Sequence, residues 1–176
     1  MKPHAYSESL LAQASLLTKK TSRHHPGAAD FRRSCSASYY ALFHYLIGET
    51  AELLPPVVRP YLRRCFRHNQ MKEVANLFKS SPSISTLTIK GSSARPPSSS
   101  PRHVVVPQEL KSVAQTFVQA QELRHDADYN LARRITKDDA QACRLEVEQA
   151  IKDWKTVKNT PAAKLFLAAC LAKAQG

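Results

Sequence analysis

The sequence predicts one all-α domain over residues 1–176, a helical bundle of about five to seven helices with a long Ser/Pro-rich loop. Three observations predict it. Apolar residues make up 43% of the chain, which is enough for a single core at this length. They recur at helical spacing through most of the sequence. No two segments show the alternation of paired strands, and with only four glycines there is no Gly-rich phosphate loop.

Two helices are expected before residue 55. From Tyr6 to Lys20 apolar residues recur as in an amphipathic helix, and the basic end suits the negative pole of the helix dipole. A turn at His24–Gly27 follows, and then a long central helix from about Ala28 to Leu54, with Asp30 near its positive end. Its apolar residues extend almost round the cylinder, so little of it should face solvent. They are Phe31, Cys35, Tyr39, Tyr40, Leu42, Phe43, Leu46 and Ile47.

Two short helices are predicted around Val57–Phe66 and Asn69–Lys79, with His68 between them. Residues 80–102 follow as a mobile surface loop or insertion, because residues 80–100 hold nine serines and three prolines. Within it, apolar residues at 84, 87 and 89 alternate with polar ones. We give a strand there little weight, since no second alternating segment is available to pair with it.

Three helices are predicted in the C-terminal part. The first starts after Pro107 and carries an apolar face that extends to Leu131. The second starts at a Thr136 cap, with Asp139 where a capping box normally has Glu or Gln, and runs to about Val157. Pro161 then opens an extra C-terminal helix within residues 161–176.

Basic side chains outnumber acidic ones by 26 to 14, a formal net charge of +12. Residues 1–105 carry 15 of the basic and 5 of the acidic groups, so an anion-binding surface should be built mostly by the N-terminal part. An excess of this size favours a polyanionic partner such as nucleic acid.

The cysteines and most histidines indicate no metal or cofactor. His24, His25 and His103 have no acidic residue close in sequence, and the four cysteines lie too far apart for a zinc knuckle or a CxxC pair. We expect reduced, mostly buried thiols at Cys35, Cys65, Cys143 and Cys170. No stretch reaches the roughly 18 apolar residues of a membrane span, and no signal peptide is recognisable, so a cytoplasmic protein with no membrane partner is expected.

The segment Arg32–His44 is rich in tyrosine and histidine. It resembles the long N-terminal helix of HEPN-domain proteins, through the pattern Arg-Arg-Ser-x-Ser-x-x-Tyr-Tyr-Ala-Leu-Phe-His. These are helical bundles of toxin–antitoxin and defence systems. The block Leu123–Tyr129 resembles their later Ala-Asp-Tyr block. The resemblance touches most of residues 5–157, without the Ser-rich loop and the last helix. Within the first block, His44 is more simply interpreted as a core histidine.

Many HEPN domains are metal-independent ribonucleases marked by an Arg, four to six residues and a His. Arg63 and His68 match this spacing and are the catalytic residues that the resemblance implies. Arg64 and Arg67 are equally good candidates for phosphate contact. The alternative interpretation is a solvated basic turn that caps a helix.

The resemblance implies RNA cleavage by the RNA's own 2′-hydroxyl. Without a metal, this reaction needs a group that moves protons and a cation that stabilises the extra charge on the phosphorane. His68 titrates near neutral pH, and Arg63 or Arg64 can bind phosphate oxygens in a bidentate manner. The products implied are a 2′,3′-cyclic phosphate and a 5′-hydroxyl. The family also implies a homodimer that completes the site, and a neighbouring antitoxin or nucleotidyltransferase as partner.

Five residues are candidates for a supporting role: Tyr40, His44, Arg124, Asp128 and Tyr129. Asp128 lies one helical turn from both Arg124 and His125 and can pair with either. It can orient a site residue or lock the bundle, and we favour the structural role. The alternative to a nuclease is a noncatalytic helical module that binds RNA or nucleotide, or docks a partner protein.

Overall fold

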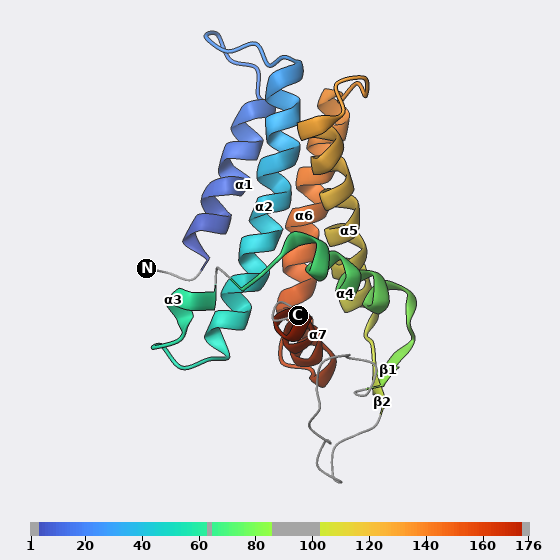
Figure 1. The fold of residues 1–176 in the computed structure, drawn as a ribbon. Helices are drawn as coiled ribbons and strands as arrows, with labels where there is room; N and C mark the ends of the chain where they lie inside the picture. The colour runs from blue at the N-terminus through green and yellow to red at the C-terminus, as the bar shows by residue number, and fades with distance from the viewer. Residues whose placement is uncertain (1–3, 63–64, 86–102, 174–176) are drawn as a thin grey trace.

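The computed structural model describes residues 4–62, 65–85 and 103–173. Over these residues the chain forms seven helices and two short strands (Figure 1). Along the chain the elements are α1 Ala5–Thr18, α2 Ala28–Glu52, α3 Arg59–Leu62, α4 His68–Ser80, β1 Ser83–Ser85, β2 His103–Val105, α5 Gln108–Tyr129, α6 Lys137–Val157 and α7 Pro161–Lys173. The predicted all-α bundle is confirmed, and none of the described helices combines the length and apolarity needed to cross a membrane.

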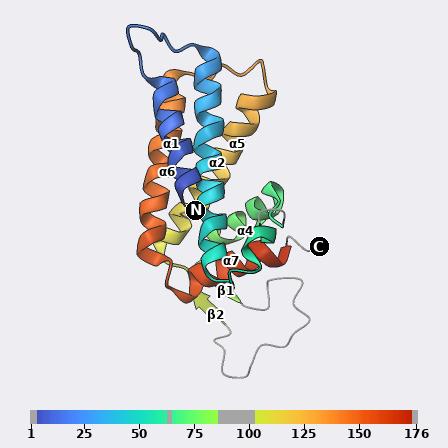
Figure 2. The same ribbon diagram turned by 90° about the vertical axis from the view of Figure 1, so that its left-hand side faces the viewer.

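The central element is α2, as its apolar pattern predicts. It packs against α1, α5 and α6, and Figure 2 shows it running between α1 and α5. From Ser34 to Thr50 every residue of α2 is buried except Tyr40 and His44, which are half-buried. Next to this four-helix arrangement, α4 packs on α5, and α7 packs on α4. Tyr40 contacts Arg124 of α5 and His68 of α4, whereas the ring of His44 contacts that of Tyr6 in α1.

The helix starts follow the predicted capping residues. At α2 the backbone N–H of Gly27 donates to Asp30 Oδ2 over 2.8 Å. At α6 the backbone N–H of Asp139 donates to Thr136 Oγ1, and the backbone N–H of Thr136 donates to Asp139 Oδ2. The bonds that the backbone N–H and the hydroxyl of Thr136 donate to Asp139 Oδ2 lower the pKa of Asp139. A capping box thus works here with Asp in the position of Glu.

The predicted helix ends need corrections. The first helix ends at Thr18 and the second at Glu52, and α3 is only the single turn Arg59–Leu62. His68 is the first residue of α4 instead of lying between two helices. Leu131 is 86% exposed, because α5 ends at Tyr129 and the chain turns away.

The prediction that Ile84 has no strand partner is wrong. β1 pairs antiparallel with β2, and Ile84 lies opposite Val104. Ile84 and the neighbouring Val106 are buried in the main core, and the backbone N–H of Val106 donates to Pro82 O. The pair is thus stabilised by packing on the bundle and does not depend on an alternating pattern in β2. The rest of the predicted loop, residues 86–102, lies outside the described residues.

All four cysteines are free thiols, as predicted. Three of them are buried and Cys65 is half-buried. The remaining core is built from apolar side chains of α2, α4, α5, α6 and α7, with Trp154 of α6 fully buried.

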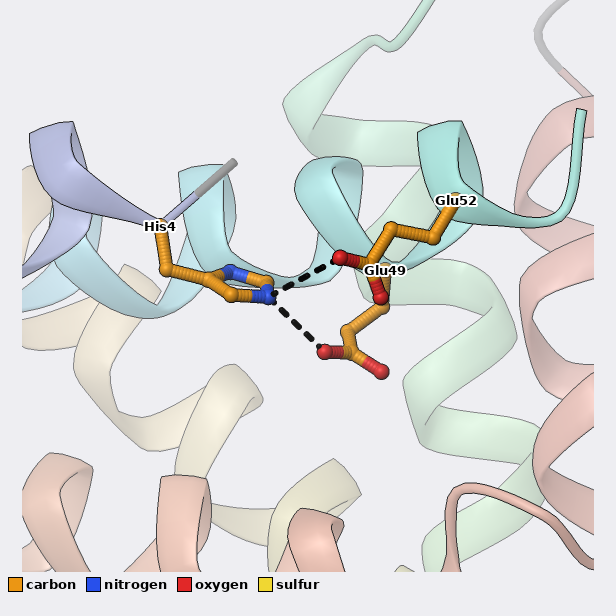
Figure 3. Close-up of side chains that lie close together, drawn as sticks. All are labelled: His4, Glu49 and Glu52. Atoms are coloured by element: carbon orange, nitrogen blue, oxygen red, sulfur yellow. Dashed lines mark ion pairs between the residues drawn. The ribbon is translucent and has the colours of Figure 1, made fainter. Parts of the chain in front are cut away.

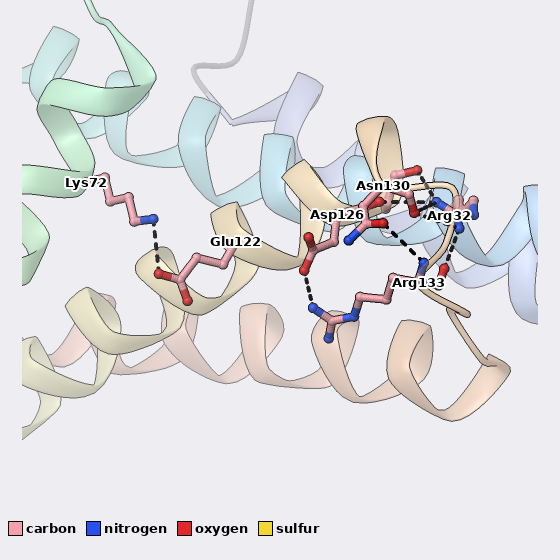
Figure 4. A network of polar contacts seen from close by, with 7 residues as sticks. Arg32, Lys72, Glu122, Asp126, Asn130 and Arg133 are labelled. Atoms are coloured by element: carbon pink, nitrogen blue, oxygen red, sulfur yellow. Dashed lines mark hydrogen bonds and ion pairs between the residues drawn. The ribbon is translucent and has the colours of Figure 1, made fainter.

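Arg32 of α2 caps the C-terminus of α5. Its Nη1 donates to the carbonyl oxygens of Asp126 at 3.2 Å, Ala127 at 2.8 Å and Asn130 at 3.3 Å. Its Nη2 donates to the carbonyl oxygens of Asn130 and Arg133. Figure 4 shows this guanidinium at the end of α5. The last carbonyls of a helix lack intrahelical partners and carry partial negative charge, so a cation is favourable there.

Arg32→Ala should therefore lower the free energy of unfolding by about 2–3 kcal/mol, because it removes charge-assisted hydrogen bonds that join α2 to α5. The adjacent exposed Arg33 is the matched control, and Arg33→Ala should change the free energy of unfolding by less than about 0.5 kcal/mol. Urea denaturation followed by circular dichroism measures both. Equal, small effects at the two positions would contradict the capping role.

Candidate functional site

A pocket of about 540 Å³ lies between α2 and α5. From α2 it is lined by Arg33, Ser36 and Tyr40, among others, and from α5 by Arg124, Asp128 and Tyr129. The predicted supporting residues Tyr40, Arg124, Asp128 and Tyr129 thus meet at one place. The pocket forms because the polar stripe of α2 faces the last two turns of α5.

Arg124 is the centre of the polar contacts in the pocket. Its Nε lies 2.7 Å from Asp128 Oδ2, and its Nη2 donates to Tyr40 Oη over 2.8 Å. Its guanidinium carbon lies 5.4 Å from the ring centroid of Tyr40 and 5.5 Å from that of Tyr129. Ser36 Oγ donates to the other carboxylate oxygen of Asp128 over 2.6 Å.

These contacts decide between the two partners predicted for Asp128. The carboxylate pairs with Arg124, and the exposed His125 instead has its ring 5.2 Å from that of Tyr129. Through Ser36 and Tyr40, Asp128 and Arg124 also connect α5 to α2. The favoured structural role for Asp128 agrees with this geometry, and the same contacts fix the shape of the pocket.

His68, the first residue of α4, packs among aromatic rings of α2. Its Nδ1 is 2.6 Å from Tyr39 Oη, its ring stacks on Phe43 at 4.2 Å, and its centroid is 5.6 Å from that of Tyr40 in an edge contact. The half-buried imidazole therefore has a fixed orientation among three aromatic rings of α2. Arg124 and His68 both contact the Tyr40 ring, from α5 and α4 respectively.

Burial lowers the pKa of His68, and the positive charge of Arg124 lowers it further. The imidazole is therefore neutral at physiological pH. Burial also raises the pKa of Tyr39, so its hydroxyl keeps its proton. The 2.6 Å contact thus joins a neutral phenol to a neutral imidazole, and either group can be the donor.

Two interhelical contacts hold α4, and with it His68, against α5. Lys72 Nζ lies 3.0 Å from Glu122 Oε1, as Figure 4 shows. One turn nearer the start of α4, Asn69 Oδ1 accepts from Gln121 Nε2 at 3.5 Å. The exposed Arg67 precedes His68 at the start of this helix.

The other predicted site residues are distributed as follows. Arg63 and Arg64 lie outside the described residues. His44 is half-buried, and its ring contacts those of Tyr6 at 4.8 Å and Tyr40 at 6.2 Å, which agrees with the interpretation as a packed histidine. Sequence reasoning missed Ser36 and Tyr39 as contact residues. The helical positions 33, 36 and 40 share one face, and this spacing is the signal that indicates Ser36.

The three arginines of the pocket differ in their partners. Arg32 is fully engaged at the end of α5, and Arg124 is held by Asp128 and Tyr40. Arg33 is exposed, and within the described part of the chain it forms no hydrogen bond or ion pair. Its guanidinium is therefore the group that can take an anion entering the pocket, and Tyr129, 66% exposed, offers an aromatic surface in the same pocket.

The lowered pKa of His68 predicts how stability depends on pH. The unfolded chain, with the ordinary value of 6.5, binds a proton more readily than the folded one. The free energy of unfolding should therefore fall as the pH drops below about 6.5, until the lower folded pKa is passed. His68→Gln should remove this part of the decrease, as urea denaturation at neutral and mildly acidic pH would reveal. The exposed His25→Gln serves as control, and an unaltered pH dependence in His68→Gln would contradict the assignment.

The site therefore combines an arginine-lined pocket, an oriented ion pair and a neutral imidazole, brought together by α2, α4 and α5. These are groups that bind anions and move protons. Comparison of the chain with family models, with curated proteins and with solved structures gives no match.

Proposed function

We propose that this chain is a HEPN-like, metal-independent RNA endonuclease in which His68 moves protons at the scissile phosphate. One observation carries the proposal: a basic pocket and an oriented, neutral imidazole meet at the same tyrosine ring, Tyr40. RNA offers phosphates to cations and unstacked bases to aromatic rings. Arg33 and Tyr129, which line the pocket and are exposed, provide both.

In the proposed reaction the neutral His68 accepts the proton of a 2′-hydroxyl. The hydroxyl oxygen attacks the adjacent phosphorus, and the bond to the 5′-oxygen breaks as this oxygen takes a proton from water. The products are a 2′,3′-cyclic phosphate and a 5′-hydroxyl. When Nδ1 donates to Tyr39 Oη, the other ring nitrogen, Nε2, is left as the base.

The extra charge on the phosphorane needs a cation next to His68. Arg63 is proposed for this role by the motif spacing, with Arg64 or the exposed Arg67 as the alternatives. The pocket of Arg33 and Arg124 then holds a neighbouring phosphate of the same strand. As part of the proposal, two copies of the chain complete the site, and an antitoxin or nucleotidyltransferase partner controls it.

Cleavage should occur in EDTA on single-stranded RNA and should stop where a single 2′-deoxynucleotide replaces the cleaved position. His68→Gln should lower the cleavage rate by about 100-fold or more, because a general base contributes about that much. Gel electrophoresis of end-labelled RNA measures the rate, and mass spectrometry identifies the cyclic phosphate.

The control for this substitution is His25→Gln, which changes an exposed histidine in the turn between α1 and α2. Both variants must first show the circular dichroism spectrum of the unmodified protein. Cleavage that survives in His68→Gln removes the residue from the mechanism. Salt-dependent RNA binding without any cleavage would instead support the noncatalytic RNA-binding module.

The pocket predicts a second effect, on binding alone. Arg33→Ala should weaken RNA binding and reduce the slope of log affinity against log salt concentration by about 0.7, the value for one phosphate contact on a single strand. Fluorescence anisotropy with labelled RNA at several salt concentrations measures this slope. Arg23→Ala, at another exposed arginine, should leave the slope unchanged. An identical loss at both positions would indicate nonspecific attraction instead of a pocket.

A further inference from the structure

A second group of chemically active side chains lies at the other end of α2, away from the pocket. Glu49 and Glu52 are one helical turn apart near the C-terminus of α2, so their carboxylates share a face. His4, which directly precedes α1, meets them there (Figure 3). Its Nε2 lies 3.0 Å from Glu49 Oε1 and 4.0 Å from Glu52 Oε1, and all three ligand atoms lie within 4.8 Å of one another.

Glu49 is the unusual member of this group, because only 6% of its side chain is exposed. Its buried Oε1 accepts no hydrogen bond in the part of the chain that the structure describes. Lys158 Nζ lies 3.8 Å from the other oxygen, Oε2. A buried carboxylate oxygen that accepts no hydrogen bond is unfavourable unless a positive charge reaches it.

The distances from His4 Nε2 to the two carboxylate oxygens suit a small metal ion. Ligands at about 2.0–2.2 Å in tetrahedral geometry lie roughly 3.4 Å from each other, and the two distances from His4 Nε2 bracket this value. The ring of His4 is already oriented, since it stacks on Tyr45 at 4.3 Å. An imidazole with two carboxylates is a nitrogen–oxygen set that suits Zn²⁺, while Ca²⁺ requires six or more oxygens.

We propose that His4, Glu49 and Glu52 bind one divalent transition-metal ion of the Zn²⁺ class, with water completing the coordination. The ion neutralises the buried carboxylate and joins the start of α1 to the end of α2. Its role is structural, and it is separate from the proposed RNA site, whose chemistry needs no metal.

The test uses the full chain without a histidine tag, freed of metal with EDTA and then dialysed. Isothermal titration with ZnCl₂ should show one ion per chain, and thermal denaturation should show a higher melting temperature with Zn²⁺ than with Mg²⁺. Co²⁺ should give visible absorption without a thiolate charge-transfer band, because no cysteine takes part. Failure to bind Zn²⁺, or a cobalt–thiolate band, would overturn the proposal.

Two variants locate the ion. Glu52→Gln changes a side chain that is 41% exposed, so the protein should fold normally, while its Zn²⁺ affinity falls at least about tenfold. His4→Gln should have the same effect. The matched control Glu8→Gln removes an exposed carboxylate of α1 that is outside the group and should leave the affinity unchanged. Equal Zn²⁺ affinity in Glu52→Gln, His4→Gln and the unmodified chain would place the ion elsewhere.

RNA cleavage in EDTA should be equal in Glu52→Gln and the unmodified chain, so this test and that of the nuclease can fail independently.

Discussion

The attraction between the Arg32 guanidinium and the unpaired carbonyl oxygens at the end of α5 sets the register of the whole site. It joins residues about 95 positions apart in sequence and fixes where along α2 the last turns of α5 lie. With that register, Ser36 and Tyr40 lie opposite Asp128 and Arg124, and their hydrogen bonds can form. A shift of one turn would separate all of these pairs.

Neighbouring residues on α2 consequently have different tasks. The guanidinium of Arg32 donates its hydrogen bonds to backbone carbonyls at the end of α5, whereas Arg33 is exposed to solvent and lines the pocket. Likewise Tyr39 is buried and orients His68, while Tyr40 contacts both that imidazole and Arg124. Some residues of α2 thus bind neighbouring helices, and others present polar groups to the pocket. Because these polar groups have hydrogen-bond partners, a segment rich in serine and tyrosine can lie at the centre of the fold.

The sequence predicts local features well and distant contacts poorly. Apolar spacing and capping residues such as Thr136 depend on near neighbours, and they locate most helices to within a few residues. By contrast, the β1–β2 pair depends on packing of Ile84 against the core, and the end of α5 depends on Arg32. Four of the five residues predicted to support the site, Tyr40, Arg124, Asp128 and Tyr129, line one pocket.

Contacts between segments that are far apart in the chain could not be predicted from the sequence. Neither the bond between Tyr39 and His68 nor the meeting of His4 with Glu49 has a local signal, because each depends on how whole helices dock. Pairing of Asp128 with Arg124 could be anticipated, since both lie on one helix. The predicted pairing of His68 with Arg63 stays a prediction.

The enclosure of α2 also has a consequence for biosynthesis. Only α1 can cover it early, because α5 and α6 follow it on the ribosome by many tens of residues. During that interval the nascent chain presents a long, largely apolar helix with two of its three permanent neighbours still missing. Exposed apolar surface of this kind binds chaperones and favours aggregation. The time for which it is exposed depends on how fast the intervening Ser/Pro-rich region is translated.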